Sequence, residues 1–119
     1  AYQEFNFGDE TDKAVNVKSG KEIWRDTQAG KPGYAGGMLT TAGNLVVYTT
    51  QGGRFTVADA RTGERLYEMS TGIAAKSGPI TFMHKGKQLI VQALGGTPGF
   101  GRDEANSVEF GHAIIAFTR

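Results

Sequence analysis

The sequence contains no cysteine among its 119 residues, and this absence excludes several kinds of site at once. Disulfide bonds, thiolate-bound metals and covalent haem attachment through C-x-x-C-H all need cysteine. Long apolar runs are also missing, since none approaches the roughly 18–20 residues that a membrane-spanning helix needs. Charge of one sign does not dominate, because 13 Lys and Arg stand against 12 Asp and Glu. These basic residues are dispersed, so the sequence carries no electrostatic footprint for nucleic acid.

Glycine, in contrast, is plentiful: it accounts for 18 of 119 residues, roughly twice the usual share. No window shows a convincing helical period. Short β-branched and aromatic runs stand between glycine-containing breaks instead, a pattern that favours many short strands joined by turns. We therefore predict an all-β fold without helices.

The stretch Gly36–Tyr67 shows this pattern most clearly. Three breaks divide it, at residues 42–44, 51–53 and 61–63. Their glycine and asparagine residues supply the positive φ that tight β-turns need. Between the breaks, residues 45–50 are rich in β-branched and aromatic side chains, while Phe55 and Val57 alternate with polar residues. The stretch is predicted to form one four-stranded antiparallel meander.

The chain also repeats itself. Shifted by 43 residues, Val15–Trp24 falls on Ala58–Tyr67, with Asn or Asp, Ser-Gly or Thr-Gly and an aromatic residue in matching places. A looser third copy adds two matches, Gly78–Phe82 with Gly37–Thr41 and Lys87–Ala93 with Asn44–Thr50. A repeat of about 40–50 residues with four strands is typical of a β-propeller blade.

The predicted fold is therefore a partial β-propeller of antiparallel four-stranded meanders with an incomplete ring. Residues 1–30 are expected to supply two outer strands of a truncated blade, residues 31–72 a complete blade, and residues 73–119 a final blade without its outer strand. The acidic residues 9–12 are interpreted as a solvated turn. Propellers use about 4–8 blades, so we expect a segment of a longer polypeptide or open strand edges satisfied by partner chains.

Three stretches resemble the quinoprotein methanol and alcohol dehydrogenases, which use pyrroloquinoline quinone (PQQ), in the C-terminal blades of their eight-bladed propeller. The first is the family's tryptophan-docking motif A-x-D-x-x-T-G-x-x-x-W, which occurs twice. Its positions are Ala14, Asn16, Gly20 and Trp24 in one copy and Val57, Asp59, Thr62, Gly63 and Tyr67 in the other. The second is the run GGMLTTAGNLVVYTTQGGRFTVADARTGERLY, and the third is GPITFMHKGKQLIVQALGGTPGFG.

The resemblance implies that Trp24 is a structural wedge between neighbouring blades. Tyr67 would do the equivalent job less well, because its hydroxyl needs a hydrogen-bond partner when buried. Neither His84 nor His112 has partners at ligand spacing, and the loop that begins at Gly95 lacks the Gly-Lys-Ser/Thr ending of a phosphate loop. We therefore expect no nucleotide site and no histidine-based metal site.

The resemblance also implies where PQQ would lie. It places two PQQ-contacting tryptophans at the positions of Ala35 and Thr97, and it matches Gly36 and Gly96. Because both indoles are absent, no cofactor is expected to bind tightly to this segment alone. In the family, the Ca²⁺ or lanthanide ligands and the carboxylate base come from earlier blades. No catalytic or metal-binding residue is therefore assigned to the 119 residues.

The function implied is the C-terminal part of a PQQ-dependent alcohol dehydrogenase, contributing scaffold and part of the cofactor-site wall, with the 119-residue chain inactive alone. The alternative is a non-catalytic propeller scaffold for protein–protein interaction. A third possibility is a small β-protein that oligomerises through its open edges. The expected partners are the remaining blades, or another chain paired at those edges, and the resemblance implies a periplasmic location although no signal peptide stands at Ala1.

Overall fold

The computed structural model describes residues 2–4, 10–28, 37–50, 53–73, 75–95 and 112–118. These residues form ten β-strands, and the described part of the chain contains no helix. The strands are β1 (Tyr2–Glu4), β2 (Glu10–Val15), β3 (Glu22–Gln28), β4 (Met38–Thr40), β5 (Leu45–Thr49), β6 (Arg54–Asp59), β7 (Arg65–Ser70), β8 (Ile80–His84), β9 (Lys87–Leu94) and β10 (Ala113–Thr118). The prediction of an all-β fold is confirmed.

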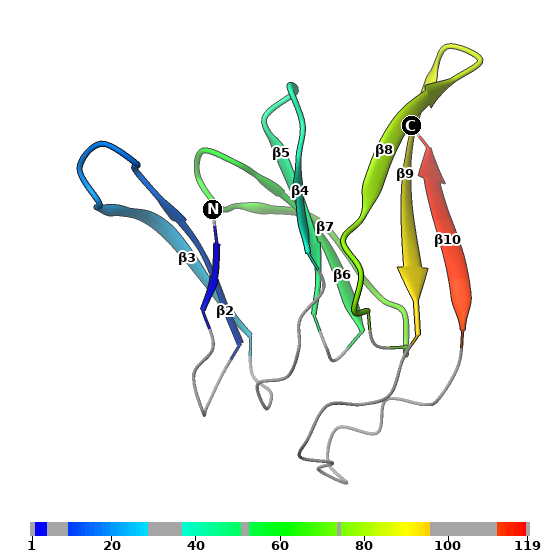
Figure 1. Ribbon diagram of the computed structural model, residues 1–119, viewed down its shortest axis with the longest axis horizontal. Coiled ribbons are helices and arrows are strands. Elements are labelled where there is room, and N and C mark those ends of the chain that lie inside the picture. The colour runs from blue at the N-terminus through cyan, green and yellow to red at the C-terminus, as the bar shows by residue number, and fades with distance from the viewer. Residues whose placement is uncertain are drawn as a thin grey trace, which may run out of the picture.

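The strands form three antiparallel sheets that stand side by side (Figure 1). Sheet 1 has the order β1-β2-β3, sheet 2 the order β4-β5-β6-β7, and sheet 3 the order β10-β9-β8. Strands that follow one another in the chain are neighbours in each sheet. Sheet 2 is the meander predicted from its glycine-containing turns, and the succession of sheets is that of blades in a propeller.

Sheet 1 differs from the prediction at its N-terminal end. β1 pairs with β2, with Tyr2 opposite Lys13 and Glu4 opposite Thr11, so the sheet has three described strands instead of two. β2 begins at Glu10, and Asp12 within it is fully buried. The interpretation of this acidic run as a solvated turn was wrong because charge alone was used to assign exposure. Strand alternation places the Asp12 carboxylate on an inward face.

The repeat of 43 residues is reproduced in the turns β2–β3 and β6–β7. The Asn16 side-chain oxygen accepts hydrogen bonds from the backbone N–H groups two and three residues later, both at 3.0 Å. The Asp59 carboxylate does the same at 2.8 and 3.2 Å. Each turn closes on a glycine with positive φ, +70° at Gly20 and +75° at Gly63, which a residue with a Cβ rarely adopts. The two turns are therefore equivalent in backbone and in side-chain capping.

Sheet 3 departs from the predicted alignment by one residue in β9. That alignment made Thr49 equivalent to Gln92, but Thr49 Oγ1 donates to Gln92 Oε1 at 3.1 Å across the gap between sheets 2 and 3. Thr49 thus points from sheet 2 toward sheet 3, and Gln92 points from sheet 3 toward sheet 2, so the two are not equivalent positions. A slip of one residue moves every side chain of a strand to the other face, and the residue of sheet 2 that corresponds to Gln92 is Tyr48. Hairpin length is the cause. Three residues separate the hydrogen-bonded Thr41 and Leu45, whereas six separate the equivalent pair Phe82 and Leu89, and the predicted alignment allowed for only two extra residues.

Candidate functional site between the sheets

Trp24 joins sheet 1 to sheet 2. It lies on β3 opposite Ala14, and only 8% of its surface is exposed. Its ring nitrogen Nε1 donates a 2.8 Å hydrogen bond to the backbone oxygen of Ala60. The ring covers Gly63 so closely that a Cβ there would lie 2.8 Å from indole carbons Cγ and Cδ2. Residue 63 must therefore be glycine for two reasons, its positive φ and the indole above it.

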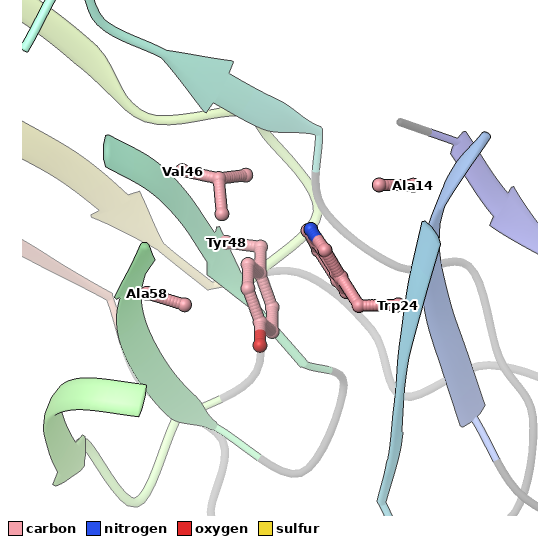
Figure 2. Packing of buried hydrophobic residues seen from close by; sticks show 5 residues of the cluster. All are labelled: Ala14, Trp24, Val46, Tyr48 and Ala58. Carbon is pink, nitrogen blue, oxygen red and sulfur yellow. The ribbon is translucent and has the colours of Figure 1, made fainter. Parts of the chain in front are cut away.

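Apolar side chains from both sheets surround the indole. Figure 2 shows Trp24 reaching from sheet 1 toward Val46, Tyr48 and Ala58 of sheet 2, with Ala14 beside it. The three residues of sheet 2 are fully buried. Full burial of one large apolar side chain contributes about 1.5–3 kcal/mol, so this cluster is the main apolar link between the two sheets.

A polar cluster of Asp26, Tyr48 and Arg65 lies beside the indole and also bridges sheets 1 and 2. The Asp26 carboxylate is 90% buried and accepts a hydrogen bond from the Tyr48 hydroxyl. Arg65 binds the same carboxylate with two nitrogens, Nε at 3.0 Å and Nη2 at 2.5 Å. Its remaining nitrogen Nη1 donates to Glu68 at 2.9 Å. A buried carboxylate with this many donors is held in one geometry.

The pKa values of this cluster follow from burial and pairing. Burial, and then the hydrogen bond to Asp26, raise the pKa of the Tyr48 hydroxyl well above its usual range. The hydrogen bonds to Asp26 raise the pKa of the Arg65 guanidinium. Tyr48 therefore stays a neutral donor and Arg65 a cation, so neither is suited to proton transfer near neutral pH. The cluster is built for holding the sheets together.

The interface between sheets 2 and 3 is neutral and aromatic. Phe55 and Phe117 stack with ring centroids 4.2 Å apart and planes inclined by 13°. Beside them, the side chain of Gln92 is fully buried. Its oxygen accepts a hydrogen bond from the Thr49 hydroxyl, and its nitrogen donates to the backbone oxygens of Ser77 and Ala93, both at 2.8 Å. The amide is thus satisfied at both ends, as a buried polar group must be.

Tyr67 does not take the position that Trp24 takes. It is 47% exposed and meets Phe117 edge to face, with centroids 6.1 Å apart. In sheet 3 the counterpart of Val57 is Ala116, because each lies opposite an equivalent residue of the neighbouring strand. A counterpart of Gly63 would thus lie beyond residue 119, and the described residues provide no glycine turn for the Tyr67 ring to cover.

The four residues expected to contact PQQ, Ala35, Gly36, Gly96 and Thr97, lie outside the described residues. Of their described neighbours, Gly37 packs so closely on Gly78 that a Cβ on it would lie 3.1 Å from the Gly78 Cα, and Gly95 has a φ of +132°, a conformation nearly restricted to glycine. Within the described ranges, no group of three or more His, Cys, Asp or Glu side chains could hold a metal ion.

The remaining docking positions lie on the turns already described, with Asn16, Gly20, Asp59 and Thr62 forming the caps. Sequence reasoning missed Asp26 and Arg65. A usable signal was present for the first, because Asp26 follows Trp24 by two residues and must share its face of the strand. For Arg65 no signal existed, because a β-bulge between Val57 and Ala58 sets its direction.

Taken together, the repeated turns and the indole seated on the next sheet define a class of protein, a run of consecutive β-propeller blades. Residues 3–90 match the family described as PQQ glucose/ethanol/alcohol dehydrogenase, beta-propeller domain, and the chain belongs to this family.

Relatives with known names support the assignment. The chain is 36% identical to the quinoprotein alcohol dehydrogenase PedH of Pseudomonas putida, over 82% of this chain and 16% of that protein. It is 39% identical to a quinoprotein ethanol dehydrogenase of Pseudomonas aeruginosa, over 75% of this chain and 13% of that protein. The chain thus spans about one sixth or less of these relatives.

Solved structures give the same answer. The quinohemoprotein alcohol dehydrogenase from Comamonas testosteroni matches with a TM-score of 0.68 and 36% identity, over 73% of this chain and 13% of that one. A europium-containing methanol dehydrogenase matches with a TM-score of 0.66 and 29% identity, over 72% and 15%. The alternative of a non-catalytic scaffold is not favoured by these relatives. No helix in the described part of the chain is long and apolar enough to cross a membrane.

Proposed function

We propose that this chain is part of the propeller of a PQQ-dependent alcohol dehydrogenase, where it supplies scaffold and part of the cofactor-site wall. The observation that carries the proposal is the family match over residues 3–90, on sheets that are joined as successive blades by Trp24. PQQ, when bound, would supply the two-electron oxidant for the conversion of an alcohol to a carbonyl compound. The residues of this chain hold and shape the site.

The blade boundaries form part of the proposal. Residues 1–30, 31–72 and 73–119 would correspond to one truncated blade, one complete blade and a final blade without its outer strand. Trp24 and the Gly63 turn would be one docking pair of this ring, which the close contact between them supports. Other blades, on the same or another chain, would cover the remaining faces.

The wall residues proposed are Ala35, Gly36, Gly96 and Thr97. Two small side chains would stand where the family has flat indoles, so the cofactor would lose stacking that contributes about 1 kcal/mol per contact. The metal would be Ca²⁺ or a lanthanide, held by other parts of the parent protein. A structural relative is named for its europium, which favours the lanthanide. We place the protein in the periplasm, which cell fractionation beside a periplasmic marker enzyme would test.

PQQ titration of the protein as its gene encodes it, with Ca²⁺ or a lanthanide, tests the proposal. Saturable binding followed by dye-linked oxidation of a primary alcohol is the expected result. The 119-residue chain alone should show no turnover. A protein that neither binds PQQ nor oxidises any alcohol would contradict the proposal.

A matched variant sharpens the test. Ala35→Trp restores one family indole and should lower the Kd for PQQ about fivefold, since about 1 kcal/mol corresponds to that factor. A Lys18→Trp variant on the distant β2–β3 turn is the control and should leave the Kd unchanged. An unchanged Kd in the Ala35 variant would remove residue 35 from the wall.

A further inference from the structure

Gly37 and Gly78, which precede the first strands of sheets 2 and 3, lie in close backbone contact with each other. A Cβ on Gly37 would lie 3.1 Å from the Gly78 Cα, and a Cβ on Gly78 would lie 3.3 Å from the Gly37 Cα. Such distances are tighter than nine in ten real Cβ contacts, so a Cβ at either position requires the facing backbone to shift by a few tenths of an ångström. Neither residue has a positive φ, so the need for glycine comes from this contact alone.

The same two sheets are spaced differently farther from this edge. On strands β6 and β10 the gap holds two stacked phenyl rings, those of Phe55 and Phe117, with centroids 4.2 Å apart. Two side chains need more room than two backbones in contact. The space between sheets 2 and 3 is therefore a wedge that is narrow at the β4 and β8 edge and wide at the β6 and β10 side.

The contact also falls at a repeated position. Gly37 and Gly78 precede the first strands of their sheets and occupy matching places in the internal repeat. The glycine of each unit thus touches the glycine of the other. Residues 35 and 36, half of the proposed cofactor wall, directly precede this contact in the chain.

We propose that Gly37 and Gly78 are positioning residues that set the separation of sheets 2 and 3 at the narrow edge, and that the contribution of residues 35 and 36 to the cofactor wall depends on this separation. The link to residues 35 and 36 as a cofactor wall rests on the proposed function. The spacing itself does not. Any side chain at either glycine would separate the two backbones at this edge, while the aromatic contact could hold the wide side in place.

The test uses Gly37→Ala, Gly78→Ala and the double variant in the protein as its gene encodes it. Gly43→Ala is the matched control, because its Cβ would meet only the Thr41 hydroxyl at an ordinary 3.7 Å and its φ is not positive. Two readouts are taken on folded protein. They are the β4–β8 separation in crystal structures and the Kd for PQQ by titration.

Each single variant should widen the β4–β8 edge and raise the Kd at least about fivefold, because small displacements at a binding site are costly. The double variant should raise it less than the product of the two, since the first methyl group already separates the strands. The control should match wild type in both readouts. An unchanged separation would refute the claim that the two glycines set the spacing of the sheets. A widened edge with an unchanged Kd would refute their role in positioning the cofactor wall. If wild type binds no PQQ, the proposed function and the positioning role fail together, and the crystal structures alone decide the spacing.

Discussion

Asp26 is the residue on which the polar contact between sheets 1 and 2 converges, since Tyr48 and Arg65 both donate to it. Asp26→Asn keeps the shape but removes the charge that Arg65 faces. We expect a loss of about 1.5–3 kcal/mol in the free energy of unfolding, the range for a hydrogen bond to a charged group. Because Arg65 is one-third exposed, the lower half of that range is favoured.

Urea unfolding measures this loss. Glu68→Gln serves as its control, because that carboxylate pairs with the same arginine at the exposed side, and exposed pairs contribute little. A stability for Asp26→Asn within 0.5 kcal/mol of wild type, about the usual size of a surface substitution, would show that the cluster does not hold the sheets.

Asp59 offers a test in which the repeat supplies its own control. The backbone N–H of Arg61, and then its side chain, hold the pKa of Asp59 below its usual value. An acid with a lowered folded pKa contributes stability above its unfolded pKa, near 3.9, and the contribution is lost as pH falls through the folded pKa. Asn16 accepts the same two backbone hydrogen bonds with an amide oxygen.

Asp59→Asn keeps both backbone hydrogen bonds but lacks the charge, so its melting temperature should lie slightly below that of wild type at pH 7, and the difference should close between pH 5 and pH 3. Thermal unfolding across that range gives the comparison, with Asp59→Ala as the variant that loses both hydrogen bonds. Equal acid sensitivity in Asp59→Asn and wild type would refute the role given to this carboxylate.

At the scale of the elements, the stacked pair Phe55 and Phe117 joins β6 to β10. A double-mutant cycle with Phe55→Leu and Phe117→Leu should give a coupling free energy of about 0.5–1.5 kcal/mol, as for aromatic pairs in contact. Leucine retains apolar contact, so each single variant should fold. Additive losses would mean that the stack does not contribute to the interface.

The elements also show how far a sequence can predict this fold. The turns of sheet 2 followed from glycine and asparagine at fixed breaks, and the equivalence of the Asn16 and Asp59 turns followed from the repeat. The register of β9 did not, because the β8–β9 hairpin is three residues longer between equivalent positions, and the resulting one-residue slip carried Gln92 to the other face. The pairing of Tyr2–Glu4 with β2 was also missed, since it depends on a partner strand and not on local pattern.

The candidate site was less accessible to prediction than the fold. The wedge role of Trp24 was implied by the resemblance to the family's docking motif, whereas the Asp26 cluster joins residues 39 positions apart on two different sheets. Such contacts depend on how sheets stack, which no periodicity within one strand encodes. Tyr67 illustrates the same limit, because its surroundings differ from those of Trp24 despite the matching motif.

At the scale of the whole molecule, the two equivalent turns differ in what covers them. The Gly63 turn lies under the Trp24 ring, whereas a Cβ on Gly20 would meet nothing within 4 Å, and Val17 beside it is 97% exposed. In a complete ring another blade would cover the Gly20 turn as well.

Gly20→Ala and Gly63→Ala make this measurable in the encoded protein. Both cost about 1–2 kcal/mol for a left-handed backbone with a Cβ, and a covering ring adds about 1–3 kcal/mol of overpacking. Equal losses in unfolding free energy are expected if both turns are covered. A distinctly smaller loss for Gly20→Ala would show that its turn is open to solvent.

Sheet 3 presents the corresponding surface at the other end. Its face away from sheet 2 carries Ile80, Phe82 and Ile114, each 45–78% exposed. Ile80 and Phe82 on β8, and Ile114 on β10, lie opposite residues 91, 89 and 93 of the central strand β9. Those three positions alternate along β9, so all of these side chains share one face of the sheet. In the proposed ring a further sheet covers them.

An experimental structure of the encoded protein with PQQ therefore tests the central claim most directly. We predict that sheets 1, 2 and 3 are consecutive blades, with sheets 1 and 2 joined at Trp24. Further sheets should cover the Gly20 turn and the face that carries Ile80 and Phe82, and PQQ should lie beside residues 35–36 and 96–97. The account would be contradicted by a structure in which both surfaces are exposed to solvent, Trp24 does not contact Gly63, and PQQ is bound elsewhere or not at all.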